Sequence, residues 1–243
     1  MPEITNTNFE SAWDEMQGSF YVRLANNFIA YKSSDKKGFK TALDISCKTS
    51  NFLNVLHGNG IKCFGYDTSK SMINYSNKKY PKINYKYSEN IIEIPFKSSF
   101  DIITCNHDAI NDLSNISDVS MLFKNVNKHL SNHGVFLFDF YTKDKIENSS
   151  LSFETSPNID CVTKFKSINS DQAMVNLFFY ITDQDGNTTK LNKIMKKFGY
   201  EVNDILEELK KNGFKNVTIV NEELTKIDNY DNAERIYVIA MKK

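Results

Sequence analysis

The chain has 243 residues, of which 40% are apolar and 13% aromatic, so it can bury a large core as one domain or two small ones. Lys and Arg together number 30, as do Asp and Glu, so the basic excess of a typical nucleic-acid-binding protein is absent. No apolar run reaches the roughly 18 residues of a membrane span, and the acidic start MPEITNTNFESAWDEM lacks a signal peptide's apolar segment.

The four cysteines are scattered along the chain, at positions 47, 63, 105 and 161. No two of them have metal-ligand spacing, and so few, widely separated thiols do not form a disulfide framework. We therefore expect no metal site, reduced thiols and a cytoplasmic protein that binds neither nucleic acid nor membrane. The oligomeric state is left open by the sequence.

The first part of the chain alternates between helical and strand patterns. Aromatic and aliphatic side chains recur at helical spacing over residues 8–32, and the polar connector KSSDKKGFK follows. Beyond it we expect strands at 41–46, 61–67, 83–88, 100–108 and 135–141. Helices are expected at 51–60, at 68–81 with Thr68 or Ser69 as the cap, and at 118–134 with Gly134 closing the helix.

This alternation predicts βαβ units and an α/β fold with a parallel sheet covered on both faces. The rhythm changes near residue 151, where 161–170, 172–187 and 188–200 read as consecutive strands with a turn at Asp185-Gly186. A helix over 201–214, capped by Gly213, and two closing strands follow. We expect a core with a helical lid over 1–150, an antiparallel β cap over 151–198, and residues 199–243 completing the core sheet.

The segment DISCKTS, Asp44–Ser50, connects the first strand to the next helix. Many nucleotide-binding proteins carry a glycine-rich loop at this point, because the backbone must approach the ligand closely. This loop contains no glycine. It is either a modified cofactor loop or only a strand-to-helix connection.

Taken together, the order and spacing of these segments resemble the class I S-adenosylmethionine-dependent methyltransferases, over nearly the whole chain. The nearest branch is similar to small bacterial enzymes related to aminosugar N-methyltransferases. DISCKTS stands where that family has Asp-x-Gly-x-Gly-x-Gly, and GYDTSKSMI, FDIITCNHDAINDL and LEELKKNGFKNVTI resemble later family segments. The resemblance implies a Rossmann-like, mostly parallel seven-stranded sheet, with S-adenosylmethionine as the cofactor.

The resemblance also implies positions for the cofactor. Asp67 would bind the ribose hydroxyls, although it could merely cap the following helix. Asp44 would orient the loop or contact the methionine ammonium, or only brace the loop. Asn90 would read adenine through its amide, with the Ile91 backbone N–H, unless it is a plain turn residue. Ser46, Lys48 and Thr68 complete the expected cofactor-binding set.

The departure from the family is that Ser46, Lys48 and Ser50 replace all three glycines. A non-glycine residue in left-handed geometry costs roughly 1–2 kcal/mol. Lys48 also adds a charge, worth on the order of 4 kcal/mol at about 4 Å. That charge would strengthen binding beside the carboxylate of the cofactor and weaken it beside the sulfonium. We therefore expect donor binding to be weak or absent.

Candidate catalytic residues follow the fourth strand, where ligands bind in open parallel sheets. His107 is a possible general base with Asp108 beside it, although a polar loop histidine is the plainer interpretation. Asn111 would hold the acceptor or form a structural turn. Trp13, Tyr21 and Tyr141 are expected to contact the acceptor, and the run Phe178–Tyr180 suggests that the cap closes over the pocket.

Two functions follow from these patterns. The first is an S-adenosylmethionine-dependent N- or O-methyltransferase that acts on a small molecule, with the cap covering the acceptor. The second is a methyltransferase-fold protein that has lost donor binding and serves as a binding or partner subunit. A smaller possibility is another anionic ligand at Lys48 and the start of the helix.

Overall fold

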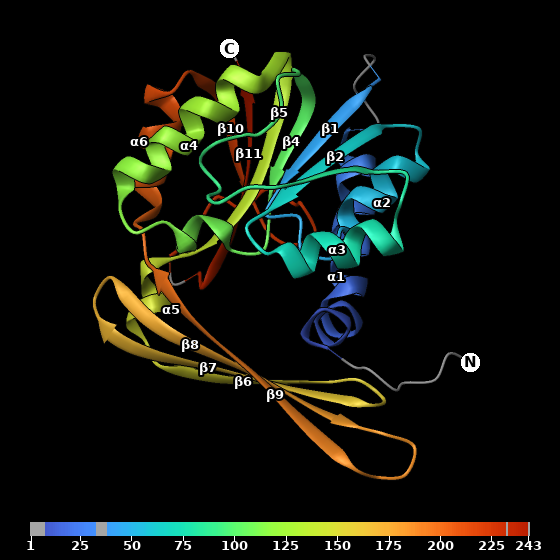
Figure 1. Ribbon diagram of the computed structural model, residues 1–243. Helices are drawn as coiled ribbons and strands as arrows, with labels where there is room; N and C mark the ends of the chain where they lie inside the picture. Colours follow the sequence, from blue (N-terminus) through green and yellow to red (C-terminus); the bar gives the residue numbers. More distant parts are fainter. Residues whose placement is uncertain (1–7, 33–37, 232, 243) are drawn as a thin grey trace.

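The computed structural model describes residues 8–32, 38–231 and 233–242 (Figure 1). Most of the predicted polar connector and the first residues of the acidic start lie outside these ranges. No helix within them is both long and apolar enough to cross a membrane.

A seven-stranded sheet forms the centre of the molecule, in the order β10-β11-β5-β4-β1-β2-β3. Its members are β1 (Thr41–Ile45), β2 (Lys62–Asp67), β3 (Asn84–Tyr87), β4 (Phe100–Cys105), β5 (Leu130–Tyr141), β10 (Phe214–Val220) and β11 (Arg235–Lys242). The pairings among β1 to β5 are parallel, and β11 runs antiparallel to both β5 and β10. The predicted parallel pairing of β1 with β2 is confirmed, with Thr41 opposite Lys62 and Ile45 opposite Tyr66.

Helices cover both faces of this sheet, as the alternating pattern predicts (Figure 1). One face carries α1 (Phe9–Lys32), α2 (Asn51–Gly58) and α3 (Lys70–Lys79), and the other carries α4 (Ile116–His129) and α6 (Val202–Lys211). In α4 the buried side chains recur at helical spacing, so a single apolar stripe faces the sheet. Gly213 follows α6 with φ of 83°, in agreement with the predicted cap.

The predicted role of Gly134 is wrong. The helix ends at His129, and β5 begins at once with Leu130, so Gly134 lies inside the strand. A β-bulge interrupts the β4–β5 register between Phe100 and Ile102. A Cβ at Gly134 would lie 2.9 Å from the Ser131 carbonyl oxygen. The glycine is therefore required by this close backbone approach at the start of the strand and not by a helix end.

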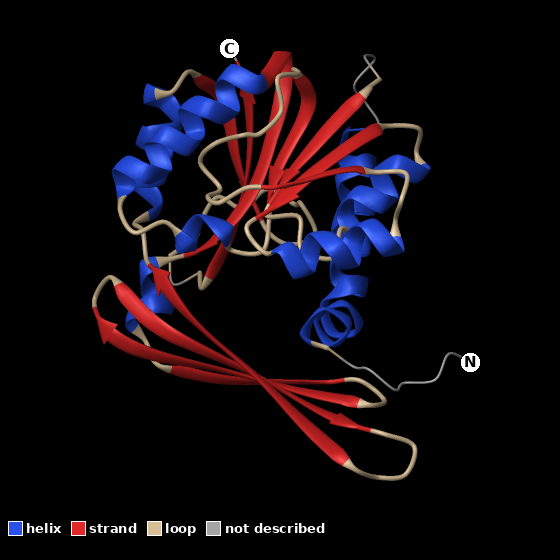
Figure 2. Cartoon of the chain, in the orientation of Figure 1, coloured by secondary structure: helices blue, strands red, loops and turns tan. Residues whose placement is uncertain are grey.

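A second, four-stranded antiparallel sheet forms the cap, in the order β6-β7-β8-β9. Its strands are β6 (Ser150–Thr155), β7 (Ile159–Asn169), β8 (Gln172–Thr182) and β9 (Thr188–Phe198), and the short helix α5 (Lys143–Glu147) precedes them. The carboxyl ends of the parallel strands point toward this cap (Figure 2). The predicted fold is confirmed, although β6, an almost fully exposed strand, was not foreseen.

The cap packs against α1 through alternate residues of β8. Leu177, Phe179 and Ile181 are buried in one cluster with Ala12 of α1, and the Phe179 ring lies 5.4 Å from that of Phe9 on α1. Phe178 and Tyr180 point the other way, where both rings contact the ammonium of Lys190. Of the aromatic run, only Phe179 therefore faces the core, as strand alternation requires.

Candidate active site at the carboxyl edge of the sheet

The loop between β1 and α2 has the backbone geometry of a glycine loop without its glycines. Ser46, Lys48 and Ser50 have φ values of 58°, 46° and 61°, all in the left-handed region. Each non-glycine residue there costs about 1–2 kcal/mol relative to ordinary geometry. The three substitutions have therefore kept the path of the loop while adding side chains to it.

Those three side chains lie in different surroundings. The Ser50 hydroxyl is 3.1 Å from Ser76 Oγ on α3 and is buried. Ser46 is also buried, at 2% exposure. Lys48 alone lines the cavity described below. Only one of the three added side chains therefore competes for ligand space.

Asp67, at the end of β2, is fully buried and holds the loop. Its carboxylate accepts hydrogen bonds from the backbone N–H of Lys48 at 3.0 Å and of Ser69 at 2.8 Å. The side-chain cap of α3 is Ser69, whose hydroxyl accepts from the Met72 N–H. Asp67 is therefore not the helix cap, and its carboxylate retains lone pairs beyond these two bonds.

Two polar side chains are buried without full pairing where β1 and β4 end. The Thr104 hydroxyl donates to Asp44 Oδ1 at 2.6 Å, while Asp44 Oδ2 has no partner among the described residues. Burial raises the pKa of Asp44 to about 7. Neither amide atom of Asn106 has a partner within the same part of the chain, although the residue is fully buried. Such orphaned groups call for a ligand, since buried polar atoms are normally paired.

His107 and Asp108 follow Asn106, both in left-handed geometry, with φ of 65° and 49°. The imidazole of His107 lies under α1, with its ring 3.7 Å from that of Tyr21 and 6.0 Å from that of Trp13. Its Nδ1 is buried and unpaired among the described residues. Burial first, and then the nearby Lys48, Arg235 and Lys197, hold the pKa of His107 well below its usual value. The ring is therefore neutral at pH 7.

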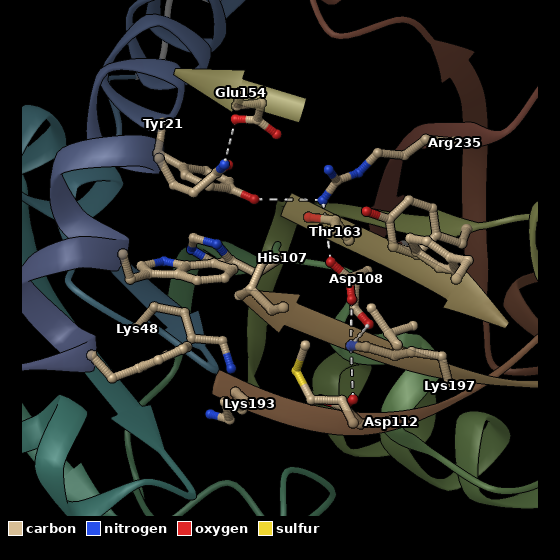
Figure 3. Close-up of a pocket in the computed structure, with 18 of the residues that line it drawn as sticks. Tyr21, Lys48, His107, Asp108, Asp112, Glu154, Thr163, Lys193, Lys197 and Arg235 are labelled. Carbon is tan, nitrogen blue, oxygen red and sulfur yellow. Dashed lines mark hydrogen bonds and ion pairs between the residues drawn. The ribbon is translucent and has the colours of Figure 1, made fainter. Parts of the chain in front are cut away.

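Asp108 joins the core to the cap through ion pairs (Figure 3). It pairs with Lys197 of β9, which also lies 2.8 Å from Asp112 in the turn of η1 (Ala109–Asp112). On the other side, Arg235 of β11 lies 3.6 Å from Asp108 and donates to Asp139. This network ties β4, β5, β9 and β11 together at one end of the sheet.

A cavity of about 120 Å³ lies between the sheet edge, α1 and the cap. Core residues form one wall and inward-facing residues of β7, β8 and β9 form the other (Figure 3). Of the residues singled out from the sequence, those that line it are Trp13, Tyr21, Lys48, His107, Asp108 and Tyr141.

Comparisons with known proteins agree with this architecture. Residues 43–138 match a family model described as a methyltransferase domain. In this matched segment and in its fold, the chain resembles the class I S-adenosylmethionine-dependent methyltransferase family. A protein of Geobacillus sp. (strain WCH70), named "Putative methyltransferase", is 23% identical over 98% of this chain and 100% of its own.

Solved structures share the fold over almost the full length. An S-adenosylmethionine-dependent methyltransferase from Clostridium acetobutylicum ATCC 824 superposes with a TM-score of 0.81 at 19% identity, over 96% of this chain and 97% of its own. An amino pentose methyltransferase from Micromonospora echinaspora, with S-adenosylmethionine bound, has a TM-score of 0.76 at 12% identity, over 100% of both chains. The cofactor of this methyltransferase family is S-adenosylmethionine.

The polar groups at the sheet edge suit this donor. An ammonium and two ribose hydroxyls need acceptors, and Asp44 Oδ2, Asn106 Oδ1 and the Asp67 carboxylate are acceptors with free capacity in the described chain. The cavity itself is small, because 120 Å³ is below the roughly 300 Å³ of a typical small-molecule site, and Asp44, Asp67 and Asn106 are not among the residues that line it.

Two predicted contacts need correction. The Asn111 amide donates to the carbonyls of Tyr141 and Phe198 and accepts from the Tyr141 N–H, so it braces the backbone and does not line the cavity. Asn90 is exposed, and its Oδ1 accepts from the backbone N–H groups of Ile92 and Glu93. This oxygen is the atom that would have received the adenine amino group, so the turn interpretation fits better.

The structure leaves the predicted donor contacts of Ile91 and Thr68 open. Ile91 is buried, and its carbonyl accepts from the Tyr66 hydroxyl, so the position of its N–H is fixed by the core. Thr68 is exposed beside Asp67. Both residues remain predicted donor contacts.

Sequence reasoning missed Asn106, Lys193, Lys197 and Arg235. A signal existed for the two lysines, because Leu191, Lys193, Met195 and Lys197 alternate along β9 and therefore share one face. Nothing in the sequence around Asn106 indicated a role. Asn106 is a candidate because its buried amide has no hydrogen-bond partner among the described residues, which only the fold shows.

Proposed function

We propose that this protein transfers a methyl group from S-adenosylmethionine to a nitrogen or oxygen atom of a small-molecule acceptor. The acceptor would bind in the cavity between the sheet edge and the cap. The observation that carries the proposal is this cavity, which is lined by His107 and Asp108 on the core side and by residues of β7, β8 and β9 on the cap side. The likeness to an amino pentose methyltransferase favours nitrogen as the nucleophile.

The donor side of the site would use the residues at the strand ends. Asp67 would bind the ribose hydroxyls, while Asp44 and Asn106 would hold the ammonium. When bound, the cofactor supplies a methyl group already activated by its sulfonium. The remaining contribution of the protein is alignment of the acceptor and exclusion of water. This explains why no strong catalytic motif is needed.

His107 is the best placed group to orient the acceptor. As a neutral imidazole it can accept a hydrogen bond from an N–H or O–H of the acceptor. Its depressed pKa makes it a weak base, so it would position the nucleophile more than it would remove a proton. The carboxylate of Asp108 is held by Lys197 and Arg235 and would fix the position of the acceptor.

The alternative of a non-catalytic subunit is not favoured. A strand-to-helix loop that binds no ligand would not need left-handed backbone geometry at Ser46, Lys48 and Ser50, three alternate positions. Nor would it leave Asn106 buried with both amide atoms unpaired among the described residues.

The proposal is tested in two steps. Calorimetry with S-adenosylmethionine and S-adenosylhomocysteine comes first, and we expect saturable binding of both. The second step incubates the protein with methyl-labelled donor and a panel of aminosugars and small amines, with His107→Ala as the control for background transfer. Absence of S-adenosylhomocysteine binding at millimolar concentration would refute the proposed function.

A further inference from the structure

Four cationic side chains line the cavity, and they differ in how their charges are balanced. Lys197 pairs with Asp108 and Asp112, and Arg235 pairs with Asp139. Lys48 and Lys193 also face the cavity, but neither ammonium has an ion-pair partner among the residues that the structure describes. Neither lysine therefore has a carboxylate within ion-pair distance in the described residues, although Asp67 and Asp112 attract both ammonium groups from farther away.

These two lysines approach from opposite walls. Lys48 belongs to the loop after β1, and Lys193 belongs to β9 of the cap (Figure 3). Burial lowers the pKa of Lys193, and repulsion from Lys48 is the next contribution. Among the described residues, the Lys193 ammonium lies 4.8 Å from the centre of the Phe9 ring, which is a weak partner for a charge. An anion between the two ammonium groups would relieve this repulsion.

Trp13 supplies a third hydrogen-bond donor. Its indole Nε1 is buried and has no hydrogen-bond partner within the described residues. Trp13 lines the same cavity. An indole N–H only donates, so its partner must be an acceptor.

We propose that Lys48, Lys193 and the Trp13 indole N–H bind an oxyanion of the acceptor, either a carboxylate or a phosphate. The inference rests on the proposed function and deepens it, because it gives the acceptor a chemical class. The oxyanion belongs to the acceptor because Lys193 is on the cap, across the cavity from the sheet edge. The free groups at that edge, Asp44 Oδ2 and Asp67, suit an ammonium and hydroxyls instead.

The test uses the full chain and the fluorescence of Trp13, which is its single tryptophan. Inorganic phosphate and acetate are titrated separately at constant ionic strength, with chloride as the balancing anion. We expect a saturable change with at least one of them, and the stronger of the two identifies the source of the oxyanion. No saturable change with either would overturn the proposal.

Matched variants assign the site. Lys193→Gln and Lys48→Gln should each weaken oxyanion binding about tenfold, the effect of about 1.4 kcal/mol. Lys196→Gln is the control, because Lys196 lies on the same strand but is exposed. Equal affinity in Lys193→Gln and Lys196→Gln would contradict the assignment. Trp13→Phe, followed by calorimetry, should also weaken binding.

A parallel measurement separates this inference from the proposed function. Affinity for S-adenosylhomocysteine is measured in wild type and in Lys193→Gln. Unchanged affinity supports an acceptor site, whereas a loss equal to the loss of oxyanion binding would show that the lysines hold the donor carboxylate and would overturn the inference. Failure of wild type to bind S-adenosylhomocysteine would refute the proposed function, while the oxyanion titration still reports on the lysine pair.

Discussion

Lys48 stands where the family has its second loop glycine, and it is the only one of the three replacements whose side chain enters the cavity. The hydroxyl of Ser50 bonds to Ser76, so that replacement contributes to the packing of α3. The three glycine replacements are therefore not equivalent, and changing each residue back to glycine should affect donor binding differently.

Reversion should strengthen donor binding mainly through Lys48→Gly. Removing its charge and bulk should tighten S-adenosylmethionine binding about tenfold, or about 1.4 kcal/mol. The triple reversion with Ser46→Gly and Ser50→Gly should add little, and Ser50→Gly alone should give no gain. Calorimetry at one salt concentration measures all four proteins. If wild type already binds at micromolar levels and Lys48→Gly binds no better, Lys48 is not an obstacle.

Asp67 should prove to be the ribose anchor. Asp67→Ala should weaken S-adenosylhomocysteine binding by about 1.5–3 kcal/mol, the usual worth of hydrogen bonds to a charged group. Because Asp67 also accepts the Lys48 and Ser69 N–H bonds, Asp67→Asn is the control that keeps one acceptor oxygen. Thermal melting identifies variants that stay folded. Unchanged affinity in a folded Asp67→Ala protein would remove the assignment.

Asp44 should make donor binding pH-dependent. Burial raises its pKa to about 7, so the folded protein prefers the protonated form, and this preference stabilises the fold at low pH and is lost as pH rises toward 7. A bound ammonium needs the ionised form, so affinity for S-adenosylhomocysteine should rise between about pH 6 and pH 8. His107 does not titrate in this range, because its pKa is depressed. Asp44→Asn should flatten the curve; a slope as steep as that of wild type would assign the titration elsewhere.

At the scale of elements, the alternation of β8 separates two phenylalanines that are adjacent in sequence. Phe179 is fully buried against Phe9 and α1, whereas Phe178 lies on the other face. Phe179→Ala should therefore lower the free energy of unfolding by about 3–5 kcal/mol, the cost of a large cavity. Phe178→Ala should cost far less. Urea denaturation of both variants is the comparison, and similar losses would mean that the cap does not pack on α1 as described.

The elements that the sequence predicts well are those with strong periodicity. α4, β1, β2, β4 and β5 contain buried apolar side chains, and their succession along the chain could be inferred without a structure. β6 could not, because its residues are almost all exposed and it exists only by pairing with β7. Gly134 was misassigned because a glycine after a helical pattern has the same local appearance as a glycine in a bulge. The same holds for the candidate site. Residues at strand ends, such as Asp44 and Asp67, could be predicted from the sequence, whereas contacts across the cavity between the core and the cap could not.

At the scale of the whole molecule, Lys197 links the cap to the core sheet. It is 4% exposed in its side chain and pairs with Asp108 and Asp112 from η1 and the end of β4. Lys197→Met removes the cation that Asp108 and Asp112 share, although Asp108 keeps Arg235 at 3.6 Å, and should cost about 1.5–3 kcal/mol. Hydrogen exchange should become faster across β7 to β9, while Lys196→Met, on the exposed face, should leave exchange unchanged. Equal protection in both variants would show that packing alone holds the cap.

The chain enters and leaves the cap at a single point of the core. Thr142, just after β5, forms a bridge with Tyr200, just before α6, and the Lys143 N–H donates to the Tyr200 carbonyl at 3.2 Å. Everything between these residues is thus an insertion with adjoining ends, a form of change that folds tolerate readily. If the cap covers the acceptor as proposed, this whole segment could be exchanged without altering the loop after β1. Acceptor recognition and donor binding would then change independently of each other.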